Sequence, residues 1–291
     1  MNRLLLCLLS FVCASAALTA HGQIDVNLQI KRRNFIRYEP LLATVTITNL
    51  SGRDLKLEDA DNQWFGFQIN GIDGSLVAPN DPNYHLEALD LKVGESVKRT
   101  VNLNTLFSIS EFGHYKIKAT IYSAQYQKFF VSKSNTFGLN DGRLIWQQSV
   151  GVPDGQPNAG DTHVVSVLAF QSDEKEYLYA RIEDREKSII YCTHKLSYMV
   201  DSQPPQIQLD ANNNLFVLQL LGPKSYVLTK IGINGEVLAQ NSYSAPKAHP
   251  YMRRLADGKL QIVGARRDAI ETAAAQVETP KLSDRPANLL K

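Results

Sequence analysis

Apolar and polar residues alternate with a period of two along much of the first half of the chain. The segments 24–30 and 42–49 show this most clearly, with apolar side chains on one face and polar ones on the other. Such alternation predicts strands that are buried on one face only. Further strands are predicted at 64–69, 75–78, 96–103, 113–122 and 128–132. About seven short strands in about 110 residues are typical of a β-sandwich.

The start of the 113–122 strand resembles a corner of immunoglobulin-like domains. Glu111, Gly113 and Tyr115 stand at alternate positions there, followed by Ile117. In such domains the tyrosine hydroxyl bonds to backbone a few residues upstream and fixes the crossing between the sheets. Ile117 stands where antibody domains carry their second cysteine, so the resemblance is to the disulfide-free kind. It implies an immunoglobulin-like β-sandwich over residues 23–139, in which Glu111, Gly113 and Tyr115 are structural.

Two other segments carry the same resemblance. Tyr38-Glu39-Pro40 precedes a Thr-rich strand, and Leu89-x-Leu91-x-Val93-Gly94-Glu95-Ser96 precedes the strand at 96–103. Both are similar to bacterial secreted immunoglobulin-like modules, including those of the macroglobulin and intracellular proteinase inhibitor type. The alternation also predicts that His114 points to solvent if Tyr115 points to the core.

The second half of the chain repeats itself. Residues 140–161 include a stretch dense in Gly and Pro and predict a linker. Over 162–267, a shift of 37 positions places Leu178 on Leu215, and a shift of 45 places Leu215 on Leu260. Units of about 40 residues with several strands resemble β-propeller blades. A closed ring needs at least about four blades, so these two to three units predict an all-β domain that is incomplete by itself. We expect an open meander packed on the sandwich, the alternative being closure by oligomerisation.

Both ends of the chain carry signals of another kind. Residues 1–22 read as a signal peptide, with Arg3 ahead of a short apolar run and small residues before a cleavage site near Ala20. We therefore expect an exported protein, periplasmic or extracellular. Residues 268–291 predict a short helix that begins after Asp268, followed by a disordered tail.

Net charge, apolar segments and cysteine count limit which kinds of partner and which cross-links the sequence suggests. The formal net charge is +2, which gives no argument for binding nucleic acid or an anionic membrane. No segment after the signal peptide has the roughly 20 apolar residues of a transmembrane helix. Cys192 is the one cysteine outside residues 1–22, so an internal disulfide is not expected and we interpret Cys192 as a buried strand residue.

Known catalytic and metal-binding motifs do not occur in the sequence. It holds no His-Glu-x-x-His, Cys-x-x-Cys, P-loop or Gly-x-Ser-x-Gly pattern. Asp210-x-Asn212-x-Asn214 begins like a calcium loop but has Leu215 where glycine is needed. We therefore expect no cofactor and no metal. Four arginines could bind an anion if they share one face, although a solvated surface is the commoner outcome; they are Arg253, Arg254, Arg266 and Arg267.

Three functions fit these patterns. The leading hypothesis is an exported, non-catalytic binding protein whose unknown partner is a protein or glycan of the envelope or the outside of the cell. The first alternative is an envelope enzyme with a polar site at the cleft between the domains, built from Asp161, His163, Asp173 and Glu174. The second alternative is a protease-inhibitor-like sandwich, which requires a protruding rigid loop.

Overall fold

The computed structural model describes residues 23–58, 63–80, 84, 86–172, 175–200, 202–246 and 249–268. The signal peptide with its cleavage site near Ala20, and the helix and tail predicted beyond Asp268, lie outside these residues. The described chain is all-β, with one short helix, α2 (Leu103–Leu106). None of its helices has the length and apolar character that crossing a membrane requires.

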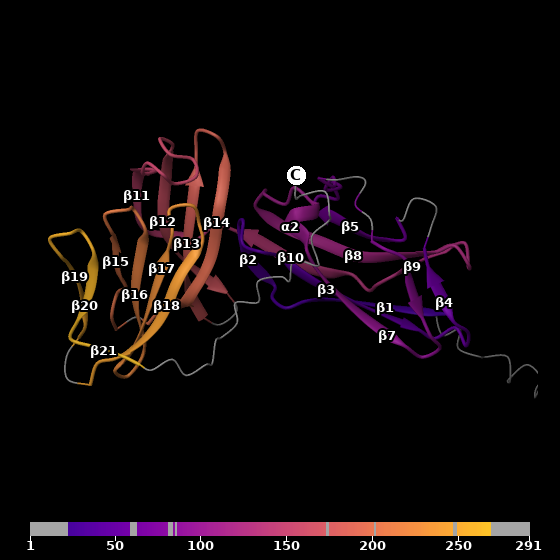
Figure 1. The fold of residues 1–291 in the computed structure, drawn as a ribbon. Helices are drawn as coiled ribbons and strands as arrows, with labels where there is room; N and C mark the ends of the chain where they lie inside the picture. Colours follow the sequence, from indigo (N-terminus) through magenta and orange to yellow (C-terminus); the bar gives the residue numbers. More distant parts are fainter. Residues whose placement is uncertain are drawn as a thin grey trace, which may run out of the picture.

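The first part of the chain packs two sheets face to face around one core (Figure 1). One sheet has the order β1-β3-β7, with bounds β1 (Ile24–Ile30), β3 (Leu42–Asn49) and β7 (Ser96–Asn102). The other has the order β2-β10-β8-β5, with bounds β2 (Asn34–Ile36), β10 (Asn135–Asn140), β8 (Gly113–Ser123) and β5 (Phe65–Gly71). Three short strands complete this part, β9 (Lys128–Val131) on β8 and the pair β4 (Leu55–Leu57) with β6 (Leu89–Leu91).

Alternation along β1 and β3 builds the core as the sequence predicted. Both strands have the predicted bounds, and their burial alternates residue by residue. Val45 and Ile47 of β3 are fully buried, while the neighbouring Thr44, Thr46 and Thr48 lie on the opposite face. The strand predicted at 75–78 is wrong, because Leu76 makes only an isolated bridge to Asn70. The Asp73 carboxylate there accepts hydrogen bonds from the Ser75 backbone and hydroxyl, which favours a turn.

The second part consists of three successive antiparallel sheets stacked side by side (Figure 1). The first contains β11 (Arg143–Gly151), β12 (Thr162–Ser172), β13 (Lys175–Asp184) and β14 (Ile189–Tyr198). The second contains β15 (Gln206–Leu209), β16 (Leu215–Gly222), β17 (Ser225–Ile231), β18 (Val237–Ser244) and β21 (Arg266–Arg267). The third is the hairpin of β19 (Tyr251–Arg254) and β20 (Leu260–Val263).

The sequence repeat corresponds to these sheets. A shift of 45 positions moves the bounds of β15 onto those of β19, and a shift of 37 moves β14 onto the region of β17. One apolar cluster fills the space between the first two sheets, and another fills the space between the second sheet and the hairpin. Each repeat unit therefore buries one face of its sheet against the next unit.

The segment predicted as a linker, residues 140–161, contains a strand. Residues 143–151 form β11, which pairs with β12 along its whole length. A bulge lies between Leu144 and Trp146 and breaks the regular alternation, which is why the pattern did not reveal a strand. Within the predicted linker, residues 141–142 and the irregular loop at 152–161 lie outside strands.

A packed junction joins the two parts. Ile36 of β2 is fully buried against an apolar cluster from the outer face of the first repeat sheet, made of Leu168, Phe170 and Tyr179. Arg32 donates from Nη1 to the Tyr179 hydroxyl at 3.2 Å and from Nη2 to Glu39 Oε2 at 2.7 Å. The two parts therefore meet through apolar packing and charge-assisted hydrogen bonds together.

A second arginine crosses the junction from the other side. Arg181, only 5% exposed, donates to Asp141 Oδ1 at 3.1 Å and to the Arg37 carbonyl at 2.8 Å. Its Nε donates to the Thr193 hydroxyl at 3.2 Å. The guanidinium fork thus connects β13 and β14 with the segment that follows β2.

Candidate functional site

β11 is a mostly exposed edge of the first repeat sheet. Six of its nine residues are exposed. β11 pairs with β12 and with no other strand in the described ranges. The backbone N–H and C=O groups on its outer side, from Arg143 to Val150, therefore have no strand partner there. An edge of this kind can pair with a strand from another chain.

Two other edge strands, β7 and β14, are protected in ways that β11 is not. β7 carries Lys98 and Arg99 at its centre, and charged residues discourage pairing at an edge. β14, the opposite edge of the same sheet, lies against the second sheet, where His194 Nε2 is 2.7 Å from the Gly235 carbonyl oxygen. β11 reads RLIWQQSVG and has a single charge, Arg143, at its first position.

A pocket of about 440 Å³ adjoins β11 on the face that looks toward the first part of the chain. Leu144 of β11 is 54% exposed at this pocket, and Gln147 accepts a hydrogen bond from Arg185 at 3.2 Å. Residues of both parts line it, among them Arg37, Tyr38, Asp141 and Arg181. The shape of the pocket next to the edge therefore depends on how the junction holds the two parts together.

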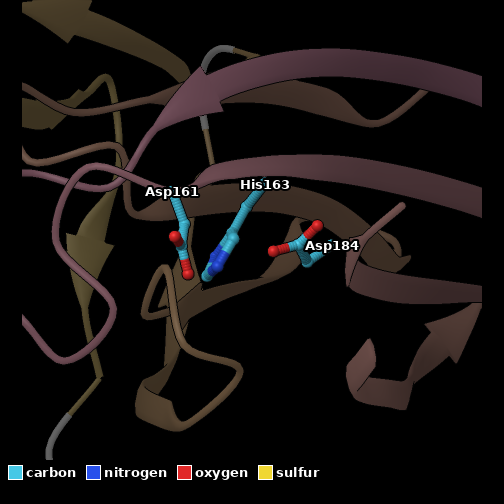
Figure 2. A group of neighbouring side chains, drawn as sticks. All are labelled: Asp161, His163 and Asp184. Atoms are coloured by element: carbon cyan, nitrogen blue, oxygen red, sulfur yellow. The ribbon is translucent and has the colours of Figure 1, made fainter. Parts of the chain in front are cut away.

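At one end of the same sheet, two carboxylates and an imidazole meet, and one of the carboxylates, Asp184, also lines the pocket. His163 is in β12, and Asp184 is the last residue of β13, one step beyond the Val164–Glu183 pair. Asp161 precedes His163 by two positions, so it points to the same face. One ligand atom from each of the three side chains lies within 4.8 Å of the others. Figure 2 shows the imidazole between the two carboxylates.

The face that carries this group is the one buried against the second sheet. His163 shares its side of β12 with Val165 and Val167, which belong to the core between the sheets. His163 is fully buried and Asp184 is 2% exposed. The His163 ring lies 4.3 Å from the Tyr191 ring, centroid to centroid.

Hydrogen bonds hold each member of the group in place. His163 Nδ1 lies 2.9 Å from the carbonyl oxygen of Ile233, in the turn that joins β17 and β18. Asp184 Oδ1 accepts from the Lys187 backbone N–H at 3.0 Å, and the Lys187 ammonium lies 2.5 Å from Asp161 Oδ2. The hydrogen bond to Asp161 raises the pKa of Lys187. His163 Nε2 is buried and has no hydrogen-bond partner.

Two of the four residues suggested for an enzymatic site therefore lie together. Asp161 and His163 are neighbours, and Asp173 and Glu174 lie outside the described residues. The group lies between two repeat sheets, whereas the hypothesis placed it at the cleft between the domains. Sequence reasoning missed Asp184, which only the antiparallel pairing of β12 with β13 places opposite His163.

The four arginines suggested for anion binding occupy two different sheets. Arg253 and Arg254 are on β19, and Arg266 and Arg267 are on β21. Neighbouring residues of a strand point to opposite faces, so at most one arginine of each pair can serve a given face. Three of them hydrogen-bond within the protein: Arg253 to Gln261, Arg254 to the Leu209 carbonyl, and Arg267 to Asn241. No hydrogen bond or ion pair joins the two pairs in the described part.

The predicted corner residues occupy the start of β8. The Tyr115 hydroxyl donates to the Glu111 carbonyl at 2.7 Å, and the Tyr115 ring stacks on Phe137 with centroids 5.2 Å apart. Gly113 has a φ of 143°, a backbone conformation that favours glycine. His114 is exposed on the opposite face of the strand.

Two further residues considered in the sequence analysis, Cys192 and Asp210, are buried or hydrogen-bonded within the fold. Cys192 is buried, and the loss of solvation raises the pKa of its thiol to about 12. Asp210 caps its own turn, accepting from the backbone N–H groups of Asn212 and Asn214 at 2.9 and 3.0 Å. It also forms an ion pair with Lys230 at 3.4 Å, so its carboxylate is used within the turn.

Comparison with known proteins adds little. No family model and no curated protein matches the chain. Among solved structures, the sporulation control protein Spo0M from Bacillus subtilis aligns with a TM-score of 0.30 and 8% identity, over 61% of this chain and 91% of Spo0M. The periplasmic chaperone SfaE aligns with a TM-score of 0.24 and 9% identity, over 75% of this chain and 98% of SfaE. At these values neither likeness bears on fold or function.

Proposed function

We propose that this protein is an exported, non-catalytic binding protein whose partner is a polypeptide that adds a strand to the edge of β11. The observation that carries the proposal is the edge itself, nine residues long with six of them exposed and no strand pairing on its outer side in the described part. Export is proposed on the sequence of residues 1–22 alone.

Strand addition accounts for the character of this edge. Backbone hydrogen bonds along an added strand supply affinity, and pockets for its alternate side chains supply specificity. The pocket beside Leu144 and Gln147 is suited to the second role. A glycan would use the same pocket without needing the backbone groups of the edge, which is why we favour a polypeptide.

The junction supports this role by fixing the geometry of the binding surface. Arg181 and the apolar cluster around Ile36 hold the outer face of the repeat sheet against the first part of the chain. A preorganised surface loses less conformational entropy on binding than a mobile one. The pocket and the edge can therefore act together on one partner.

The proposal is tested by photo-crosslinking in living cells. A photoreactive amino acid replaces Gln148 on β11 in one variant and Gln240, which is exposed on β18, in a control. We expect one defined partner to crosslink at Gln148 and not at Gln240. Equal capture at both positions would contradict binding at the β11 edge.

Affinity for that partner then provides the quantitative test. The double substitution Gln148→Lys with Ser149→Lys adds charges of the kind that protect edge strands, and we expect it to weaken binding at least ten-fold. Gln240→Lys adds a charge to another strand and should leave the affinity unchanged. Measurable turnover of a glycan, peptide or ester panel by the purified protein would contradict the non-catalytic part of the proposal.

A further inference from the structure

We infer that Asp161, His163 and Asp184 form a binding site for one divalent transition-metal ion, with Zn²⁺ the best match to these ligands. The site lies at the end of β12 and β13, between the first and second repeat sheets, and Asp184 also borders the pocket beside β11. This inference is independent of the proposed partner.

The position of the hydrogen on His163 Nδ1 is the first step of the argument. A carbonyl oxygen can only accept, so the 2.9 Å contact with Ile233 requires that Nδ1 carry the hydrogen. In the neutral ring Nε2 then presents a bare lone pair. Metal-binding histidines show this arrangement, because the hydrogen bond from the other nitrogen fixes the tautomer and the ring orientation.

The burial of Nε2 is the second step. His163 is fully buried, and Nε2 has no hydrogen-bond partner. A buried polar atom left without a partner is costly and calls for an explanation. The Asp161 and Asp184 carboxylates, which when ionised can only accept, each have an oxygen within 4.8 Å of an imidazole nitrogen of this ring. A lone pair between two acceptors is satisfied by a cation.

The spacing of the ligand atoms is compatible with a metal ion. They lie within 4.8 Å of one another. Ligands of a tetrahedral ion at about 2.1 Å stand about 3.4 Å apart, so small rotations of the aspartate side chains would close the set. Asp161 has room for such a rotation because its side chain is 20% exposed.

The donor set selects the class of metal. One imidazole nitrogen and two carboxylate oxygens suit Zn²⁺ and neighbouring transition metals, whereas Ca²⁺ and Mg²⁺ prefer sets made of oxygen alone. The burial of His163 and Asp184 is typical of a site that joins structural elements. A metal ion here would connect β12 and β13 through its ligands and, through the Nδ1 hydrogen bond, the turn at Ile233 of the second sheet.

Lys187 is the cation that now neutralises Asp161. Its ammonium lies 2.5 Å from Asp161 Oδ2, and its side chain is 51% exposed. Because the lysine is exposed, it can move into solvent when a metal ion takes its place. Replacing Lys187 with methionine removes this competitor while keeping most of the apolar stem, so K187M should bind the metal more tightly than the wild-type protein.

The test is a titration of the exported chain, purified without a metal-binding tag and stripped with a chelator. Isothermal calorimetry with Zn²⁺ should show one ion per chain, and the midpoint of thermal unfolding should rise as the ion binds. Asp161→Asn should weaken Zn²⁺ binding at least ten-fold. The variant should stay folded, because Asp161 is the most exposed of the three ligands. Asp257→Asn is the matched control, since Asp257 pairs with Lys259 at 2.9 Å in an exposed turn.

Spectroscopy of Co²⁺ in place of Zn²⁺ distinguishes this site from surface binding. We expect absorption bands of a low-coordinate Co²⁺ ion in the wild type and in D257N, with loss of those bands in D161N and H163Q. The inference is overturned if millimolar Zn²⁺ gives neither heat nor a thermal shift. It is also overturned if D161N and H163Q bind Zn²⁺ as the wild type does, since the ion would then lie elsewhere.

Discussion

The Tyr115 hydroxyl and the His114 imidazole are neighbours in sequence with opposite surroundings. Tyr115 is 7% exposed and donates to the Glu111 carbonyl, whereas His114 faces solvent. Tyr115→Phe removes one largely buried hydrogen bond and should lower the free energy of unfolding by about 1 kcal/mol or more. Urea denaturation measures this difference, with His114→Ala as the control that should change almost nothing. A larger loss in H114A would contradict the facing of β8.

The Cys192 thiol provides a test of burial in the repeat sheets. Desolvation raises its pKa to about 12, so at pH 8 the folded protein should resist thiol-reactive dyes and react only when urea unfolds it. The raised pKa also means that the unfolded chain releases this proton first. Its contribution to stability is therefore complete below about pH 9 and declines as the pH rises toward 12.

The free energy of unfolding, measured between pH 8 and pH 11, checks this sign. Cys192→Ala removes the thiol, so its stability should fall less steeply with pH than that of the wild type. Rapid labelling of the native wild-type protein at pH 8 would contradict the burial of Cys192.

The candidate metal ligands show what residue patterns can and cannot predict. Asp161 and His163 attracted attention because they are close in sequence. Asp184 is 21 positions from His163 and stands opposite it only because β12 and β13 pair antiparallel in one register. A register is set by turn geometry and by packing of the whole sheet, which no local pattern around Asp184 contains.

At the scale of strands, alternation predicted the elements that are buried on one face. β1 and β3 have the predicted bounds because each packs one regular face on the core. β11 was missed for a physical reason. Its bulge between Leu144 and Trp146 and its mostly exposed side chains remove the two-residue period, and the Gly-rich loop that follows it suggested a linker.

The exposure that hid β11 from prediction is also the basis of its proposed role. A strand that is paired on both sides and buried carries a strong apolar pattern, whereas an exposed edge strand keeps polar side chains and unpaired backbone groups. The Gln-Gln-Ser sequence of β11 lacks the central charges that β7 carries.

At the scale of the molecule, the junction is packed too tightly for an added methyl group. A Cβ atom at Gly142 would lie 2.9 Å from Ile36 Cδ1, 2.9 Å from Leu168 Cβ and 3.1 Å from the Ala169 carbonyl oxygen. Gly142→Ala should therefore lower the free energy of unfolding by about 1–3 kcal/mol through overpacking.

Gly151 offers the matched control for that substitution. A Cβ atom there meets nothing within 4 Å and its φ is not in the positive region, so Gly151→Ala should leave stability nearly unchanged. Denaturant unfolding compares the two variants. Equal stability of G142A and the wild type would contradict a tightly packed junction between the parts.

Hydrogen exchange of the protein bound to the partner captured at Gln148 tests the central claim most directly. Strand addition predicts that backbone amides of β11, between Arg143 and Val150, exchange more slowly in the complex than in the unbound protein. Amides of β7, a charged edge on the other part of the molecule, should be unaffected. Unchanged exchange along β11, with protection appearing on another surface, would contradict the proposal that β11 receives the partner strand.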